Sequence, residues 1–365
     1  MSEDFNIISF LKSAVAAGAS DEHLKVGHSP FLRINGFIKK TNSKVLTIED
    51  MDNAIMEIAP ISVKDSILTS FDLDFMFEIK GCSRFRINYN RQLGTPALVI
   101  RNITYDIPTL EELSLPEALN EIIQYQNGII LVTGPTGSGK STTIASLINN
   151  INENSAKHII TIEDPVEYIY NCKKSIVSQR QIGVDTASFS DGIKYALRQD
   201  PDVIFIGEIR DKETMSAALK AAETGHLVLT TLHTNDAVQT INRIVNMFEE
   251  SNRSIVRKQL SETLRATIAQ KLVYSEALNK RFPVCEILVS TPTIKDYISK
   301  GVTEEIYELI SENNVDNMVS MNSSLALLVS QGKITQEEAL ETSNDENELE
   351  KLFRGVYQGT KNYYE

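Results

Sequence analysis

The sequence contains no tryptophan, only three cysteines, and no apolar run near the ~20 residues that a membrane-spanning helix needs. Cys82, Cys172 and Cys285 are far apart and form no Cys-x-x-Cys pair, which excludes a zinc ribbon and a dithiol redox motif. The N-terminus opens with acidic residues and lacks the basic stretch of a secretory signal. We therefore expect a cytoplasmic protein.

Positive charge is also scarce, because 36 Lys and Arg face 49 Asp and Glu, for a net charge of −13. This balance disfavours a broad footprint on nucleic acid, so we expect no nucleic-acid partner, although a ring pore could still hold a local basic patch. Residues 301–365 are especially acidic, with four basic and 13 acidic residues. Such a tail indicates either a solvated helical face or a docking surface.

The N-terminal third, residues 1–105, has the patterns of a compact α+β domain. The stretches "HLKV", "FLRI" and "FIKK" predict a meander of short strands, and "LDFMFEI", "RFRINYN" and "PALVIRNI" predict three more. Between these groups, Thr47 and Asp50 form a capping box before an amphipathic helix, "MDNAIMEIA". Pro108 and Pro116 then bracket a polar stretch, which predicts a linker over residues 106–116.

Residues 117–290 alternate apolar strands with helical patterns. The strands "GIILVT", "HIITI", "DVIFI" and "LVLTTL" are short and continuously apolar, which is typical of parallel strands covered by helices on both faces. We expect a parallel α/β sheet with ligand chemistry at the carboxyl ends of its strands. Residues 291–365 are predicted to form a helical C-terminal region.

One glycine-rich stretch, "GPTGSGKSTT", follows the strand "GIILVT" and precedes a helical pattern. It satisfies G-x-x-x-x-G-K-[ST] in the strand–loop–helix context that a P-loop requires. Its glycines let backbone N–H groups approach phosphates, Lys140 should reach the β- and γ-phosphates, and Ser141 should bind Mg²⁺. The predicted nucleotide-binding residues here are Gly134, Pro135, Thr136, Gly137, Ser138, Gly139, Lys140, Ser141 and Thr142.

Two further apolar strands end in acidic residues. "ITIEDP" places Glu163 and Asp164 after one strand, and "DVIFIGEIRD" places Glu208 and Arg210 after another. Carboxylates at strand ends beside a P-loop lie where Mg²⁺ and an attacking water bind. The alternative for any single acid is an exposed charge at the end of a strand.

Two histidines and four arginines complete the candidate set. His226 and His233 stand at the two ends of the strand "LVLTTL", where a structural histidine is the default and His233 could instead contact the γ-phosphate. Without nearby cysteine, their spacing does not indicate zinc. The predicted N-terminal strands carry Arg84, Arg86, Arg91 and Arg101. Such arginines are solvated, form salt bridges, or act as arginine fingers.

The four stretches around these residues resemble, in order and spacing, the Walker A, Asp box ("TIEDPVEYI"), Walker B ("ALRQDPDVIFIGEIRD") and His box ("AAETGHLVLTTLHTNDA") of the secretion-ATPase superfamily. Within it, the chain resembles the PilT-like type IV pilus retraction (twitching motility) ATPases over about residues 5–355. The resemblance implies a PAS-like N-terminal domain, a RecA-like ATPase domain and a homohexameric ring with ATP between the domains. It also implies a motor that depolymerises pili at the cytoplasmic face of the inner membrane, with a membrane platform protein as partner.

The resemblance also assigns roles to individual residues. Lys140 and Ser141 correspond to the phosphate and Mg²⁺ ligands, and Glu208 to the Walker B glutamate, which is catalytic and close to the metal. The other residues carried over are Glu163 and Asp164 of the Asp box, Arg210 of Walker B, His226 and His233 of the His box, and Arg86 and Arg101 facing the nucleotide from the N-terminal domain.

The sequence leaves the branch of the family open. The chain lacks the long N-terminal region and tetracysteine motif of pilus assembly and type II secretion ATPases, which favours the retraction branch. However, the "AIRNL" motif of retraction enzymes corresponds to "TIKDYI", Thr293–Ile298, with Lys295 and Asp296 in place of its Arg and Asn. An accessory retraction ATPase of the PilU type, with a paralogous pilus ATPase as its partner, therefore stays an alternative. A low-turnover ring-forming module and a DNA-translocating ring are further alternatives.

Overall fold

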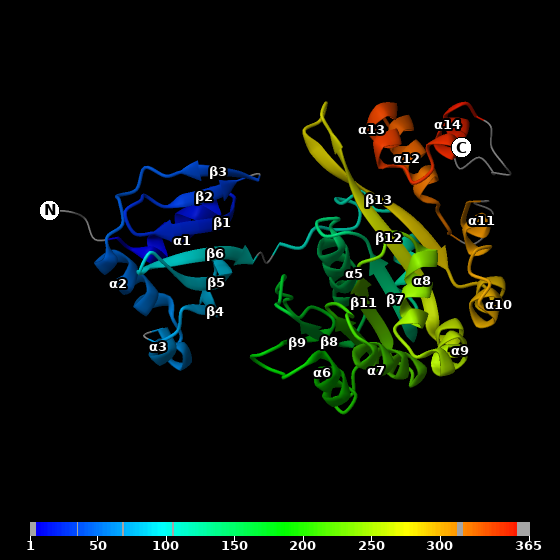
Figure 1. The fold of residues 1–365 in the computed structure, drawn as a ribbon, viewed down its shortest axis with the longest axis horizontal. Coiled ribbons are helices and arrows are strands. Elements are labelled where there is room, and N and C mark those ends of the chain that lie inside the picture. Colours follow the sequence, from blue (N-terminus) through cyan, green and yellow to red (C-terminus); the bar gives the residue numbers. More distant parts are fainter. Residues whose placement is uncertain (1–4, 35, 68, 104–105, 312–316, 356–365) are drawn as a thin grey trace. The chain divides into compact units, whose positions relative to one another are not determined.

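The computed structural model describes residues 5–34, 36–67, 69–103, 106–311 and 317–355. The chain divides into two compact units (Figure 1). The first unit is Met1–Asp106 with Glu167–Ile169, and the second is Ile107–Val166 with Tyr170–Glu365. The division falls beside the predicted linker, in which Leu110 and Leu115 are buried, and its role as a linker stays a prediction.

The first unit is built on a six-stranded antiparallel sheet in the order β3-β2-β1-β6-β5-β4. Its strands are β1 (Ala19–Lys25), β2 (Phe31–Ile34), β3 (Phe37–Lys40), β4 (Asp72–Ile79), β5 (Ser83–Gln92) and β6 (Thr95–Ile103). Its helices are α1 (Ile7–Ala16), α2 (Ile48–Ile58) and α3 (Ile61–Ile67). All six predicted strands and the predicted helix are present, and Thr47 and Asp50 form the capping box at the start of α2.

The core of the first unit lies between its helices and the sheet. Leu11 of α1 and Met51 of α2 share one buried cluster with Phe85, Ile87 and Ile100 of β5 and β6. Helix α1 was not predicted, although the chain carries its signals. Asn6 caps it by accepting a hydrogen bond from the Ser9 N–H, and its buried residues, Ile7, Leu11 and Ala14, recur at helical spacing.

The second unit is built on a seven-stranded sheet in the order β13-β12-β7-β11-β10-β8-β9. Its strands are β7 (Gly128–Thr133), β8 (His158–Glu163), β9 (Ile176–Gln181), β10 (Val203–Ile206), β11 (Leu227–Leu232), β12 (Leu264–Ser275) and β13 (Lys280–Val289). The helices up to β12 are α4 (Ala118–Ile122), α5 (Lys140–Asn154), α6 (Phe189–Ala196), α7 (Lys212–Glu223), α8 (Ala237–Asn246), the 3₁₀ turn η1 (Glu250–Asn252) and α9 (Arg253–Thr263). The four predicted apolar strands are β7, β8, β10 and β11.

The expectation of an all-parallel sheet needs one correction. Strands β12, β7, β11, β10, β8 and β9 are parallel, but β13 runs antiparallel to β12. The two are joined by a tight hairpin in which Ser275 pairs with Lys280, and so short a connection cannot return a parallel strand. Strand β12 was missed because its sequence, "LRATIAQKLVYS", interrupts the apolar residues with polar ones.

Helices follow the hairpin to the end of the described chain, as predicted for residues 291–365. They are α10 (Pro292–Lys300), α11 (Ile306–Ser311), α12 (Met321–Ser330), α13 (Gln336–Thr342) and α14 (Glu346–Phe353). Phe282 and Val284 of β13 form a separate small core with Met321, Leu325 and Leu349 of these helices. The parts of this region at 312–316 and 356–365 lie outside the described residues.

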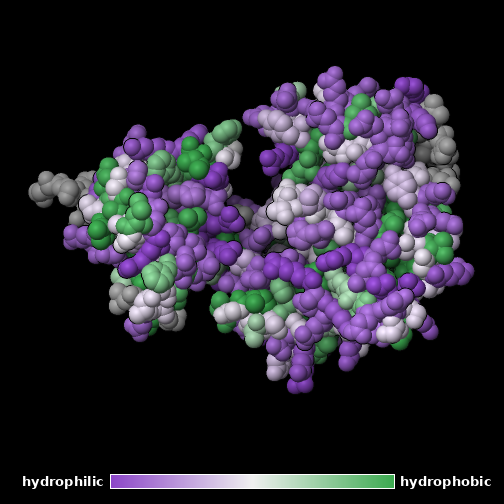
Figure 2. Space-filling view, in the orientation of Figure 1, coloured by the Kyte–Doolittle hydropathy of each residue, from purple (hydrophilic) through white to green (hydrophobic). Residues whose placement is uncertain are grey.

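The visible surface of each unit is mostly hydrophilic, with separate small apolar patches (Figure 2). This agrees with the acidic composition of the whole chain. Among the helices that the structure describes, none has both the length and the apolar character needed to cross a bilayer.

Candidate active site

The glycine-rich loop lies at the carboxyl end of β7, a strand whose six residues are all buried. The loop leads directly into α5, which begins at Lys140. Gly134 has φ 144°, and a Cβ there would lie 2.2 Å from the Gln270 carbonyl oxygen. Gly139 has φ 86°, and a Cβ there would lie 2.9 Å from the Gln270 amide nitrogen. Both positions therefore require glycine, which lets the loop wrap closely at a helix N-terminus, the geometry that suits a phosphate chain.

Lys140 is buried against this loop. Its Nζ donates to the carbonyl oxygens of Gly134, at 2.8 Å, and Pro135, at 2.9 Å. Ser141 is exposed in the first turn of α5. The loop thus combines a helix N-terminus, an ammonium group and a hydroxyl, and this donor set fits a nucleotide polyphosphate with its metal.

Glu163 is the last residue of β8 and is buried. Its Oε1 accepts hydrogen bonds from Thr161 Oγ1 at 2.6 Å and from Gln179 Nε2 at 3.3 Å. Asp164 follows it and is exposed. The Asp-box acid is therefore held in one orientation by its neighbours, whereas the next carboxylate faces solvent.

Glu208 lies two residues after β10 and contacts two of the other predicted residues. It accepts a hydrogen bond from Arg210, and His233 Nε2 lies 3.5 Å from its Oε2. The hydrogen bond to this carboxylate raises the pKa of Arg210 above its usual value. The structure thus brings together the ends of β10 and β11.

Strand register places these groups at one edge of the sheet. Ile206 pairs with Ile162 and with Thr230, so Glu163 and Glu208 both follow at the carboxyl edge. Leu232 pairs with Thr133, which places His233 beside the start of the P-loop. The loop, both acids and His233 therefore share the edge at which parallel α/β sheets bind ligands.

His226 lies at the other edge. It precedes Leu227, which pairs with Gly128 at the start of β7, so about six residues of strand, roughly 20 Å, separate it from the P-loop of the same chain. Its Nδ1 is 3.0 Å from the Ala221 carbonyl oxygen and 3.2 Å from Thr224 Oγ1. The structure does not bring His226 to the phosphate loop of its own chain, and a role in nucleotide binding stays a prediction.

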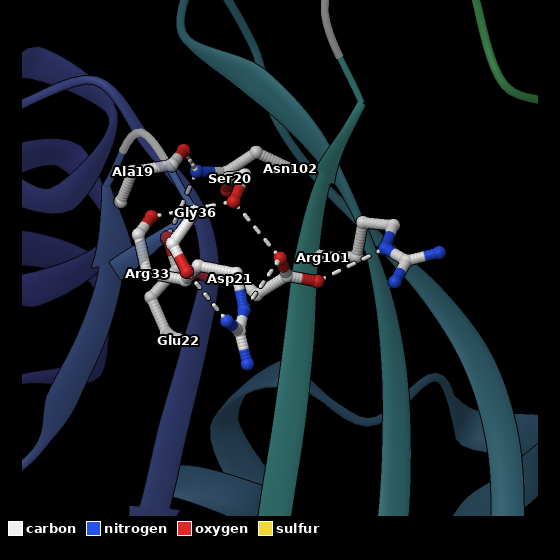
Figure 3. Close-up of polar contacts among 8 residues, drawn as sticks. All are labelled: Ala19, Ser20, Asp21, Glu22, Arg33, Gly36, Arg101 and Asn102. Carbon is white, nitrogen blue, oxygen red and sulfur yellow. Dashed lines mark hydrogen bonds and ion pairs between the residues drawn. The ribbon is translucent and has the colours of Figure 1, made fainter. Parts of the chain in front are cut away.

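Two of the predicted arginines of the first unit, Arg86 and Arg101, form ion pairs on its sheet, and Figure 3 shows the pair of Arg101 with Asp21. Arg101 Nε donates to Asp21 Oδ1 at 3.0 Å, and Arg33 Nε lies 3.8 Å from Asp21 Oδ2. Asp21 is nearly buried, while 65% of the Arg101 side chain is exposed. Arg86 Nε is 3.9 Å from Asp74 Oδ1. Within this unit, Arg86 and Arg101 therefore both form salt bridges, which was one of the three alternatives for these arginines.

Three buried polar residues were not singled out by the sequence analysis. Gln270 of β12 donates a hydrogen bond to the Ser138 carbonyl of the P-loop. In the first unit, Glu22 is fully buried and accepts a hydrogen bond from Asn102 Nδ2 at 2.9 Å (Figure 3). Burial raises the pKa of Glu22 to about 8. In the second unit, Glu286 of β13 is fully buried and accepts from the Ala237 N–H at the start of α8, at 2.8 Å. None of the three lies in a recognisable motif.

Comparison with known proteins places this geometry in a family. Residues 10–354 match the family described as "Type II/IV secretion system protein". The chain belongs to this family. It is 38% identical over 337 residues to the type IV pilus retraction ATPase PilT of Pseudomonas aeruginosa, covering 92% of this chain and 97% of that one.

Two further relatives agree with this assignment. The type IV pilus ATPase PilU of Pseudomonas aeruginosa is 37% identical, with 94% of this chain and 90% of that protein covered. A crystal structure of the pilus retraction motor PilT with bound ADP superposes with a TM-score of 0.88 at 42% identity, covering 95% of this chain and 99% of the other. With the P-loop and both strand-end acids in place, the chain is a nucleotide-binding P-loop ATPase of the secretion family.

Proposed function

We propose that this ATPase is a homohexameric, Mg²⁺-dependent motor that powers type IV pilus retraction. The observation that carries the proposal is the full-length similarity to a retraction ATPase in a chain whose P-loop, Glu163 and Glu208 meet at one sheet edge. The motor would work at the cytoplasmic face of the inner membrane, on a membrane platform protein. Its product would be pilin returned from the filament, which is the basis of twitching motility.

The residues of the second unit divide the chemistry among them. Lys140 and the loop N–H groups hold the phosphates, and Ser141 with Glu208 holds Mg²⁺, which when bound neutralises charge on the β- and γ-phosphates. Glu208 is the better placed acid for orienting the attacking water, because it is less deeply buried than Glu163 and contacts His233. His233 lies beside Glu208 and the start of the P-loop, where it would contact the γ-phosphate. Glu163, which Thr161 holds in place by a hydrogen bond, adds a second carboxylate beside Glu208 at this edge of the sheet.

Arg86 and Arg101 supply the charge that couples hydrolysis to motion. In this proposal the first unit closes on a nucleotide and both guanidinium groups face its phosphates, where they stabilise the charge of the transferring phosphoryl group. Arg101 would leave Asp21 to do so, and Arg33 would remain as the partner of that carboxylate. Residues 106–116 act as the hinge of the resulting rigid-body rotation.

An accessory retraction ATPase of the PilU type is the second candidate, supported by the 37% identity to PilU. The diverged stretch Thr293–Ile298 lies on α10, where Asp296 accepts a hydrogen bond from Lys300 at 2.6 Å. The position that carries Asn in the retraction motif is therefore held in a helix-surface ion pair.

Deletion of the gene, scored for surface pili and twitching, tests the proposal. We expect excess pili that do not retract, restored by the wild-type gene and not by Lys140→Ala. Loss of pili would indicate an assembly motor instead. Normal pili with only weakened twitching would indicate the accessory enzyme. Steady-state ATPase measurement on the purified protein separates a motor from a low-turnover ring, since the latter would hydrolyse almost no ATP.

A further inference from the structure

Gln270 is a buried glutamine whose side-chain amide contacts the phosphate loop at one end and helix α5 at the other. It lies on β12, one residue beyond the pairing of Ala269 with Thr133, and is therefore level with the start of the loop. Its Nε2 donates to the Ser138 carbonyl oxygen at 2.7 Å. Its Oε1 accepts from Thr143 Oγ1, in the first turn of α5, also at 2.7 Å. One side chain thus joins the loop to the helix that follows it.

These two bonds require an amide. The Ser138 carbonyl can only accept, and the Thr143 hydroxyl here donates, so the side chain between them must donate at one end and accept at the other. Gln270 and Thr143 are 2% and 1% exposed, so water cannot replace either bond. An apolar side chain would leave a buried carbonyl unsatisfied, and a carboxylate would face that carbonyl with negative charge.

The bond to Ser138 also determines the direction of the next N–H group. The Ser138 carbonyl and the Gly139 N–H belong to one planar trans peptide and point in opposite directions. Because the carbonyl points to Gln270, the Gly139 N–H points away from β12. Gly139 has φ 86°, a conformation in which glycine has unusual freedom, so this peptide needs an external contact to select one orientation.

We propose that Gln270 is a positioning residue for nucleotide binding, which orients the Ser138–Gly139 peptide so that the Gly139 N–H faces the phosphates. P-loops hold phosphates chiefly through backbone N–H groups, so a rotated peptide replaces a donor by a carbonyl that repels the anion. Gln270 never touches the nucleotide and acts through the loop. The inference concerns nucleotide binding by the purified chain and does not depend on pilus retraction.

Two substitutions of similar size separate the parts of this role. Gln270→Met removes both hydrogen bonds without adding charge. Gln270→Glu keeps the acceptor for Thr143 and replaces the donor facing Ser138 by a second acceptor, until the introduced carboxyl is protonated. The matched control is Thr267→Val on the same strand, because Thr267 is fully buried and its hydroxyl has no hydrogen-bond partner among the described residues.

The test measures the Kd for Mg·ADP, the KM and kcat for ATP, and the melting temperature of each full-length variant from pH 6 to pH 8. At pH 8 we expect both Gln270 variants to raise Kd and KM by roughly tenfold or more, and Thr267→Val to change neither. Relative to the wild type at each pH, the affinity of Gln270→Glu should recover as the pH falls, because protonation restores a donor to the Ser138 carbonyl, whereas Gln270→Met should show no recovery. Folded variants with wild-type Kd and KM at pH 8, even with a lower melting temperature, would show that Gln270 only fills the core and would overturn the proposal. An equal loss of nucleotide affinity in both variants at every pH would show that a donor to the Ser138 carbonyl does not matter, and it would also overturn the proposal.

Discussion

Both units of this protein hold charged side chains in polar contacts, but the contacting residues differ in how far apart they lie in the sequence. In the second unit, Lys140 bonds to the loop carbonyls of Gly134 and Pro135, and Glu208 bonds to Arg210, so these contacts are local in sequence. In the first unit Asp21 and Arg101 are 80 residues apart and meet because β1 pairs with β6. Local contacts leave a motif in the sequence, whereas contacts made by strand pairing leave none.

The difference has a functional meaning. Glu163 and Glu208 of the second unit stand at strand ends, in the position where parallel α/β sheets bind ligands, and the P-loop at the same edge needs its glycines. In the first unit, Asp21 and Glu22 lie on β1, and Glu22 is buried with one oxygen that has no hydrogen-bond partner among the described residues. In the proposed function, the second unit carries the residues that act on ATP, and the first unit contributes Arg101.

The largest effect is expected at the P-loop. Lys140→Ala should abolish ATP turnover, because the β- and γ-phosphates lose the ammonium group of the loop. The melting temperature should change little, since the hydrogen bonds of the Lys140 Nζ to Gly134 and Pro135 lie within the loop itself. Steady-state hydrolysis and thermal unfolding of one preparation measure both quantities. ATP turnover at the wild-type rate in this variant would show that the loop is not the catalytic P-loop.

A loss of at least ~10²-fold in hydrolysis is expected for Glu208→Gln, with ATP binding retained. The amide still contacts Arg210 but no longer orients a water as a base does. Single-turnover hydrolysis and nucleotide titration separate the two effects. Glu249→Gln, which removes an exposed acid paired with Lys212 in the same unit, is the matched control and should leave hydrolysis unchanged. If nucleotide affinity collapses in Glu208→Gln, the residue mainly holds Mg²⁺.

A smaller effect, about tenfold in kcat, is expected for Arg101→Ala. Arg33→Ala is the control, because Arg33 shares Asp21 but is not proposed to reach the nucleotide. Specific activity and melting temperature should be measured together on the full chain. A lower melting temperature with normal activity of the folded fraction would show that Arg101 only pairs with Asp21, and the proposed contrast between the units would fail.

The smallest effect is expected from Glu22, and it appears as a pH dependence of stability. Burial raises the pKa of this carboxyl to about 8, so the folded state binds the proton more tightly than the unfolded state. The free energy of unfolding should therefore fall as the pH rises from about 5 towards 8. Glu22→Gln, which keeps an acceptor for Asn102, should remove part of this slope and stabilise the protein at pH 8, on the order of 1–3 kcal/mol. Denaturant unfolding at pH 5.5 and pH 8 measures it, and an unchanged slope would show that Glu22 is ionised in the folded state.

Much of the fold could be predicted because its signals are local. The apolar strands β7 and β11 were predicted with the bounds that they have, since both faces of a buried parallel strand must be apolar. Strands β9 and β12 were not predicted, because each carries polar residues that only the finished structure explains. In β12 one of these is Gln270, whose amide faces the P-loop, and the next is Lys271, which donates to the Thr342 carbonyl and to Asn344.

The sequence by itself determined the P-loop, the strand-end acids and the family, because each is a short pattern whose chemistry depends on neighbours along the chain. Tertiary structure alone decided which polar residues support them. Strand order brought Gln270 beside Ser138, the pairing of β1 with β6 brought Asp21 to Arg101, and the parallel direction of β11 put His226 and His233 at opposite edges. The physical reason is that hydrogen-bond partners across a sheet are set by strand order and register, which depend on the whole hydrophobic core and have no local signature.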